Sequence, residues 1–72
     1  MGESWSKSVF SEVVSELAYD PDTQELTVTW KKGQPGVYMG VPEDHADQLS
    51  RAASVGSMIH SEFKGVYPYR GL

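Results

Sequence analysis

The chain has 72 residues, a formal net charge of −4 and no cysteine. A chain this short forms one domain that buries about 60% of its unfolded surface, so we expect a stability of a few kcal/mol. The absence of cysteine excludes a disulfide framework and a thiolate zinc site, and the negative charge gives no general attraction to nucleic acid or anionic lipid.

Residues 1–9 predict a flexible lead-in, because they combine a glycine, several serines and mixed charges. Trp5 is expected to pack back on the domain or to be disordered rather than to anchor a partner. The segment lacks the apolar core of a signal peptide, and no run approaches the roughly 18 apolar residues of a membrane span. We therefore expect one domain over residues 10–72 in a soluble, cytoplasmic protein that does not contact a membrane.

Two extended segments predict a β-hairpin. Residues 10–19 suit a strand only slightly better than a helix, but residues 20–23, Asp-Pro-Asp-Thr, supply turn chemistry directly afterwards. Residues 24–30 then alternate cleanly, with Leu26 and Val28 on one face and threonines on the other. The turn chemistry and the alternation in residues 24–30 therefore favour a strand over a helix for residues 10–19.

A loop, a third strand and a helix follow. Residues 31–36 hold two lysines, two glycines and a proline, which indicates a solvated turn, and residues 37–41 predict a short strand. Pro42 fixes its φ near the helical value and so begins a helix, with acids at Glu43 and Asp44 in the first turn. The expected apolar stripe of this helix consists of Ala46, Leu49, Ala52 and Ala53.

A second, shorter helix is expected after a break at residues 54–57. Gly56 suits a left-handed or closely approached position there, and Ser57 is the candidate N-cap. Lys64 and Gly65 predict the end of this helix. Its apolar face consists of Val55, Met58, Ile59 and Phe63.

The tail at residues 66–70 is predicted to be extended, with Tyr67 packed and Tyr69 and Arg70 more exposed. The predicted fold class is α+β, a three-stranded antiparallel β-meander followed by two short α-helices packed on one face. The predicted core consists of Val14, Leu17, Leu26, Val28, Trp30, Tyr38, Val41, Leu49, Ala52, Ile59 and Phe63.

A series of short motifs runs through the chain in a fixed order. Its residues are Tyr19, Asp20, Leu26, Val28, Trp30, Gly33, Tyr38, Val41, Pro42, Leu49, Ala52, Ser54, Gly56, Phe63 and Tyr67. This order resembles the KTSC domain, whose pattern runs YD, LxVxF, G, YxY, VP, L, AxSxG and a closing Y, over about residues 10–69. The resemblance implies a domain found at the end of some lysyl-tRNA synthetases and in short bacterial and phage proteins, without an established activity.

Two positions depart from that pattern. Gly36 stands where the family has the first aromatic residue of YxY, and His60 stands near a position where Asn is common. If the paired aromatic residues form a binding surface in relatives, we expect this chain to have lost half of it.

Catalytic and metal chemistry find little support in the sequence. The histidines, His45 and His60, have no metal-site spacing, and no cofactor motif is present. Ser54 or Ser57 with His60 and Glu62 resembles a triad only on paper, because no strand-to-helix elbow holds a nucleophile. We expect these serines to cap backbone groups, and the protein to be neither an enzyme nor a metal or cofactor carrier.

Two binding functions stay open. The first is a small protein-interaction module, because the two edges of a short sheet accept a partner's strand or a copy of the chain; if the chain is phage-encoded, a host protein is the expected partner. The alternative is binding of RNA, tRNA or a single strand through a basic and aromatic surface. The candidate binding residues for either function are Lys31, Lys32, Tyr38, Lys64, Tyr67, Tyr69 and Arg70.

Overall fold

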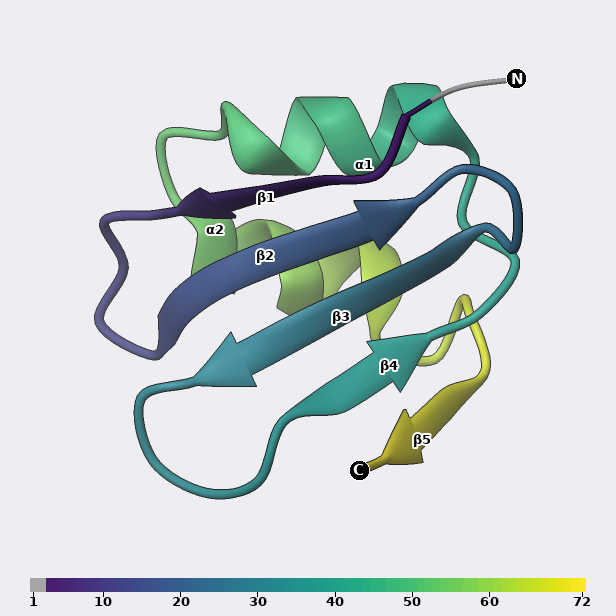
Figure 1. The fold of residues 1–72 in the computed structure, drawn as a ribbon. Helices are drawn as coiled ribbons and strands as arrows, with labels where there is room; N and C mark the ends of the chain where they lie inside the picture. Colours follow the sequence, from purple (N-terminus) through teal and green to yellow (C-terminus); the bar gives the residue numbers. More distant parts are fainter. Residues whose placement is uncertain (1–2) are drawn as a thin grey trace.

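The computed structural model describes residues 3–72 and shows one antiparallel sheet with helices on one of its faces (Figure 1). Residues 1 and 2 of the expected lead-in lie outside the described residues. The strands follow one another across the sheet in chain order: β1 (Trp5–Ser8), β2 (Val14–Asp20), β3 (Glu25–Trp30), β4 (Gly36–Tyr38) and β5 (Tyr69–Gly71). Between β4 and β5 the chain forms α1 (Glu43–Ser50), α2 (Val55–Met58) and the π-helix η1 (Ile59–Phe63).

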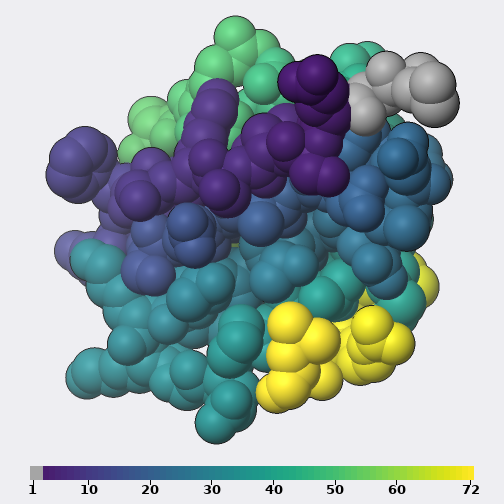
Figure 2. All heavy atoms as spheres, in the orientation of Figure 1, coloured from purple at the N-terminus to yellow at the C-terminus, as the bar shows by residue number. Residues whose placement is uncertain are grey.

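The sheet has five strands, so the prediction of three was wrong. Trp5–Ser8 of the expected lead-in is β1, which pairs with β2 and places the Trp5 ring 5.8 Å from that of Tyr19. Tyr69–Gly71 of the expected tail is β5, which pairs with β4. Both strands are short and largely exposed, so they lack the apolar alternation by which a strand is recognised in sequence. Figure 2 shows them at opposite borders of the uncovered sheet face, β1 in purple and the C-terminal residues in yellow.

The hairpin of β2 and β3 is confirmed. The backbone N–H of Asp22 donates to the Asp20 carboxylate at 3.0 Å, which is the turn chemistry expected of residues 20–23. Leu17 lies opposite Val28 in the register, and both side chains are buried beneath the helices. The hairpin therefore forms the centre of the sheet.

The first helix begins as predicted and ends early. The backbone N–H of Ala46 donates to the carbonyl of Pro42 at 3.1 Å, so the proline directly precedes the first turn. The helix ends at Ser50, which leaves Ala52 and Ala53 beyond it rather than on its apolar stripe. Before this helix β4 ends at Tyr38, short of the expected Val41, because Gly40 has a φ of +73° that turns the chain out of the sheet.

The second helical segment begins earlier than predicted. Ser54, not Ser57, occupies the N-cap position, because Val55 is already helical and turns its side chain into the core. The Ser54 side chain makes no capping hydrogen bond, so the expectation that it caps a backbone group is wrong. Gly56 lies within the helix, where an added Cβ would lie 2.9 Å from Cγ2 of Val13, so the expected close approach is right and the left-handed alternative is wrong. In η1 the backbone N–H of Lys64 donates to the Ile59 carbonyl at 2.8 Å, five residues back.

The core lies between the sheet and the helices. Of the predicted core residues, Trp30 and Ala52 are only partly buried, and the others are buried. Tyr19 joins the core and donates its hydroxyl hydrogen to the carbonyl of Val41 at 2.5 Å, tying β2 to the segment before α1. Across residues 3–72, no helix has the length and apolar character needed to cross a membrane.

Candidate binding cleft

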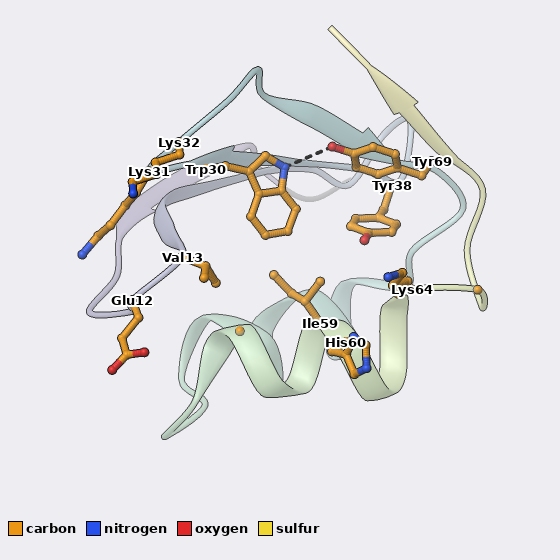
Figure 3. A pocket seen from close by; sticks show the side chains of 12 residues that line it. Glu12, Val13, Trp30, Lys31, Lys32, Tyr38, Ile59, His60, Lys64 and Tyr69 are labelled. Carbon is orange, nitrogen blue, oxygen red and sulfur yellow. Dashed lines mark hydrogen bonds between the residues drawn. The ribbon is translucent and has the colours of Figure 1, made fainter.

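A half-open cleft of about 1030 Å³ lies between the end of the sheet and the α2–η1 helix (Figure 3). Trp30, the last residue of β3, turns its ring from the sheet into the gap between the sheet and this helix. Val13 from the β1–β2 loop and Ile59 from η1 point toward that ring from the other sides. The interior of the cleft is therefore apolar.

Three aromatic side chains form one wall of the cleft. Trp30 donates its indole N–H to the hydroxyl oxygen of Tyr69 at 3.0 Å, and the rings of Tyr38 and Tyr69 have centroids 4.7 Å apart. Tyr38 and Tyr69 lie opposite each other in the β4–β5 register, so the pairing of β5 brings the two rings together. Burial, with a smaller contribution from Tyr69, raises the pKa of Tyr38 above 10.0, so this phenol holds its proton more tightly than an exposed tyrosine does.

Tyr69 fills the space that Gly36 leaves open. A Cβ at position 36 would lie 1.8 Å from the Tyr69 hydroxyl oxygen and 2.1 Å from Cζ of the same ring. The glycine therefore allows a ring from β5 to lie beside Tyr38. Gly36 does remove one aromatic residue of the family pattern, but Tyr38 still packs against a second ring. That ring belongs to Tyr69, 31 positions after Tyr38 in the chain.

Lysines stand at the rim of this apolar cleft. Lys31 and Lys32 come from the β3–β4 loop, and Lys64 follows η1 on the opposite side. All three are exposed, and Glu12 is the one acid among the described residues that line the cleft. The rim is thus locally positive in a chain of net charge −4, although water and salt screen such exposed charges.

The structure divides the candidate binding residues into two groups. Lys31, Lys32, Tyr38, Lys64 and Tyr69 line the cleft, and Tyr67 and Arg70 do not. Arg70 neighbours Tyr69 in β5, and successive strand residues point to opposite faces. Sequence reasoning missed the contribution of Trp30, Val13 and Ile59 to this site. The signal for Trp30 was its place as the last residue of a strand, directly before two lysines.

Tyr67 belongs to a separate contact between the helices and the tail. Its hydroxyl lies 2.6 Å from Nδ1 of His45, and Nε2 of the same histidine lies 3.0 Å from a Glu62 carboxylate oxygen. Because the carboxylate only accepts, this arrangement suits the tautomer with its proton on Nε2 and Tyr67 as donor to Nδ1. The His45 ring also packs on Phe63, with centroids 4.3 Å apart. The cluster holds α1 against η1.

The residues considered as a catalytic triad make separate contacts in the structure. Glu62 contacts His45, as described above, while His60 lines the cleft. The carbonyl of Ser57 accepts a hydrogen bond from the Ser61 hydroxyl at 3.0 Å within the helix. Over residues 3–72, no three His, Asp or Glu side chains gather in a group able to hold a metal ion.

Comparison with known proteins places the chain in a family. The model of the KTSC domain matches residues 10–67, which is most of the chain. The chain belongs to the KTSC domain family. A crystal structure of a KTSC domain protein from Yersinia pestis is similar, with a TM-score of 0.90 and 26% identity, covering 97% of this chain and 99% of that chain. No curated protein matches.

The KTSC match includes one part of the cleft and leaves out another. Trp30, Tyr38 and all three rim lysines lie within the matched residues, whereas Tyr69 lies just beyond them. The five-stranded sheet is nevertheless part of a shared fold, since the similarity to the Yersinia pestis structure extends over nearly the whole of both chains. The aromatic wall of this KTSC domain thus combines matched residues with one from the C-terminal strand.

Proposed function

We propose that this KTSC domain is a non-catalytic protein-interaction module whose cleft binds a short apolar segment of a partner, flanked by acidic residues. The observation that carries the proposal is the combination of an aromatic and aliphatic interior with three lysines at its rim. An apolar partner side chain matches the interior, and acidic neighbours match the rim. Small sites of this kind bind through apolar contact, with a few polar groups setting orientation.

The cleft suits a partner better than the sheet edges do. β1 has four residues and carries Lys7 in its middle, and β5 has three residues. Short edge strands and edge lysines are means by which proteins discourage the addition of a further strand. A partner strand at either edge would therefore gain few backbone hydrogen bonds, whereas the cleft offers continuous apolar surface.

The apolar contacts should supply most of the affinity. Burying one large apolar side chain of the partner contributes about 1.5–3 kcal/mol, and an aromatic pair adds about 0.5–1.5 kcal/mol. An exposed ion pair with Lys31, Lys32 or Lys64 contributes only about 0–1 kcal/mol. The lysines should therefore act mainly on selectivity and association rate.

A single-stranded nucleic acid is the second candidate, favoured by the same juxtaposition of Trp30, Tyr38 and Tyr69 with lysines. Bases stacked on aromatic side chains contribute about 1–3 kcal/mol each, with little sequence preference. With three lysines as phosphate contacts, the logarithm of the affinity should fall with the logarithm of salt concentration with a slope of about −2. A peptide held mainly by apolar contact should show a much smaller slope.

The test is a titration of the full chain, labelled with ¹⁵N, by an acetylated peptide Asp-Glu-Phe-Leu-Asp-Glu and by a short oligouridine. The expected result is that the peptide shifts the amide signals of Trp30, Tyr38 and Ile59. Tyr69→Ala should weaken peptide binding about two- to tenfold, the loss expected when one aromatic contact of the size given above is removed.

Charge variants separate the rim from general electrostatics. The double variant Lys31→Glu/Lys32→Glu should weaken peptide binding, while Arg70→Glu, at an exposed cation outside the cleft, should leave it unchanged. Binding of oligouridine with the steep salt dependence, and no binding of the peptide, would replace the proposal with the nucleic-acid candidate. Signal shifts confined to β1 would contradict the cleft as the site.

A further inference from the structure

Phe10 in the β1–β2 loop is a large aromatic side chain that the fold leaves fully exposed. Val13 in the same loop is half exposed, and Figure 2 shows the indigo loop projecting from the left side of the molecule. Scattered exposed apolar residues are common, but a fully exposed phenylalanine beside a hollow is a candidate interaction surface. A second hollow of about 550 Å³, lined by Phe10, Val13 and His60 among others, lies beside the loop. Val13 and His60 also line the cleft, so the two surfaces adjoin.

Hydrogen bonds to the Ser11 side chain and to the Val13 carbonyl hold the loop in this position. The Ser11 hydroxyl oxygen accepts hydrogen bonds from the N–H groups of Val13 and Val14, each at 3.2 Å. The carbonyl of Val13 accepts from the N–H of Lys31 at 2.8 Å, which ties the loop to the end of β3. Phe10 lines the second hollow and not the cleft of its own chain, where Val13 occupies the near wall.

The loop has the chemistry that suits the cleft. Phe10, Ser11 and Glu12 present an aromatic side chain and, two residues later, an exposed carboxylate. Within residues 3–72, Glu12 makes no ion pair, although Lys31 and Lys32 line the same cleft. An aromatic residue with a nearby acid is the kind of segment that the lysine-rimmed aromatic cleft is proposed to bind.

We propose that two copies of this chain form a two-fold symmetric dimer in which Phe10 of each copy enters the cleft of the other. Glu12 then faces the rim lysines of the opposite copy. Because the loop and the cleft adjoin on one face, a single two-fold axis satisfies both contacts at once, as a closed symmetric dimer requires. This inference rests on the proposed function, since it gives the same cleft an occupant of the same chemistry from the chain itself.

The dimer should be weak and should compete with the partner. Two loops buried in two clefts cover less than the roughly 1,200–2,000 Å² of a stable interface, and each copy carries a net charge of −4 that opposes association. We expect a dissociation constant of about 10⁻⁴ M, which corresponds to a contact of this limited size. At high concentration the dimer would block the cleft, and a partner segment would release it.

The first test is sedimentation equilibrium of the full chain up to about 1 mM, a range that brackets the expected dissociation constant. Phe10→Ser should raise the dissociation constant at least about tenfold, as loss of a buried aromatic side chain requires. Val66→Ser removes an exposed apolar residue that does not line the cleft, and it should leave association unchanged. A wild-type chain that stays monomeric, or a dimer that Phe10→Ser leaves intact, would overturn the inference.

The second test exchanges the charges of loop and rim. Glu12→Lys alone and Lys31→Glu/Lys32→Glu alone each place like charges together, so each variant should have a higher dissociation constant for its dimer than the wild-type chain. Mixed in equal amounts, the two variants restore opposite charges in both contacts and should form a heterodimer. Circular dichroism of each variant checks that it is folded. A mixture that stays monomeric while both variants are folded would refute the pairing of Glu12 with the rim.

The two proposals fail in different ways. Phe10→Ser keeps the cleft, so it should bind the acidic peptide of the preceding subsection at least as well as the wild-type chain. Peptide binding without any wild-type dimer refutes self-association and leaves the proposed function standing. A dimer lost in Phe10→Ser, together with no peptide binding by that variant, supports self-association and refutes the proposed partner chemistry.

Discussion

Replacing Gly36 with alanine tests the packing that forms the aromatic wall. The three atoms nearest to the added Cβ all belong to Tyr69, the closest at 1.8 Å, so the ring must move. Its movement breaks the 3.0 Å hydrogen bond from Trp30 and the contact with Tyr38. These losses cost about 1–2 kcal/mol, and the lower entropy of alanine in the unfolded chain offsets about 0.4–1 kcal/mol. We expect Gly36→Ala to lower the free energy of unfolding by about 1 kcal/mol.

The decisive measurement is a double-mutant cycle by urea unfolding with circular dichroism. In a Tyr69→Ala background the new Cβ no longer meets a ring, and Gly36 has no positive φ that would strain an alanine. The same substitution should then stabilise the domain by about 0.4–1 kcal/mol, a reversal of sign. Equal effects of Gly36→Ala in both backgrounds would refute the account of Tyr69 packing in the space above the glycine.

Three further outcomes test the core. Tyr19→Phe leaves the buried carbonyl of Val41 without its donor and should lower the free energy of unfolding by about 1–3 kcal/mol in urea; a change of a few tenths would contradict the bond. Burial raises the pKa of Tyr19 and of Tyr38 above the ordinary 10.0, so the folded chain holds these protons more tightly. The stability that these protonated phenols contribute is fully present below pH 10.0 and is lost as the pH rises through their raised pKa values in the folded chain. The urea concentration at the midpoint of unfolding should therefore fall in alkaline solution, and it should fall less steeply for Tyr19→Phe. Phe63→Ala should cost about 3–5 kcal/mol and leave so small a domain largely unfolded by circular dichroism, whereas Phe63→Leu should stay folded.

The parts of the fold that sequence predicted are those decided by local chemistry. The Asp-Pro turn between β2 and β3 follows from a side chain that bonds the neighbouring backbone, since the Asp20 carboxylate accepts a hydrogen bond from the backbone N–H of Asp22. Pro42 occupies the N-cap of α1, where its φ of −64° is set by its ring. Gly65 follows η1 with a φ of +79°, a conformation that glycine adopts without strain.

The parts that sequence reasoning missed depend on neighbours distant in the chain. β1 and β5 are held by backbone pairing with β2 and β4, and this pairing needs little from their own side chains. The early start of α2 follows from the burial of Val55, which local capping preferences at Ser57 do not reveal. Trp30 was expected in the core because of its alternation with Leu26 and Val28, yet its ring is only partly buried because it lines the open cleft.

For this protein, sequence alone determined the KTSC family pattern, the central hairpin, most of the core and the identity of several residues around the cleft. The order of the motif residues and the spacing of the apolar residues carry this information, because both are patterns among positions close together in the chain. Only the tertiary structure decided that Tyr69 lies over Gly36, that the three lysines share one rim, and that Tyr67 and Arg70 lie elsewhere. These placements depend on strand pairing and helix packing between residues far apart in the chain, which no local pattern specifies.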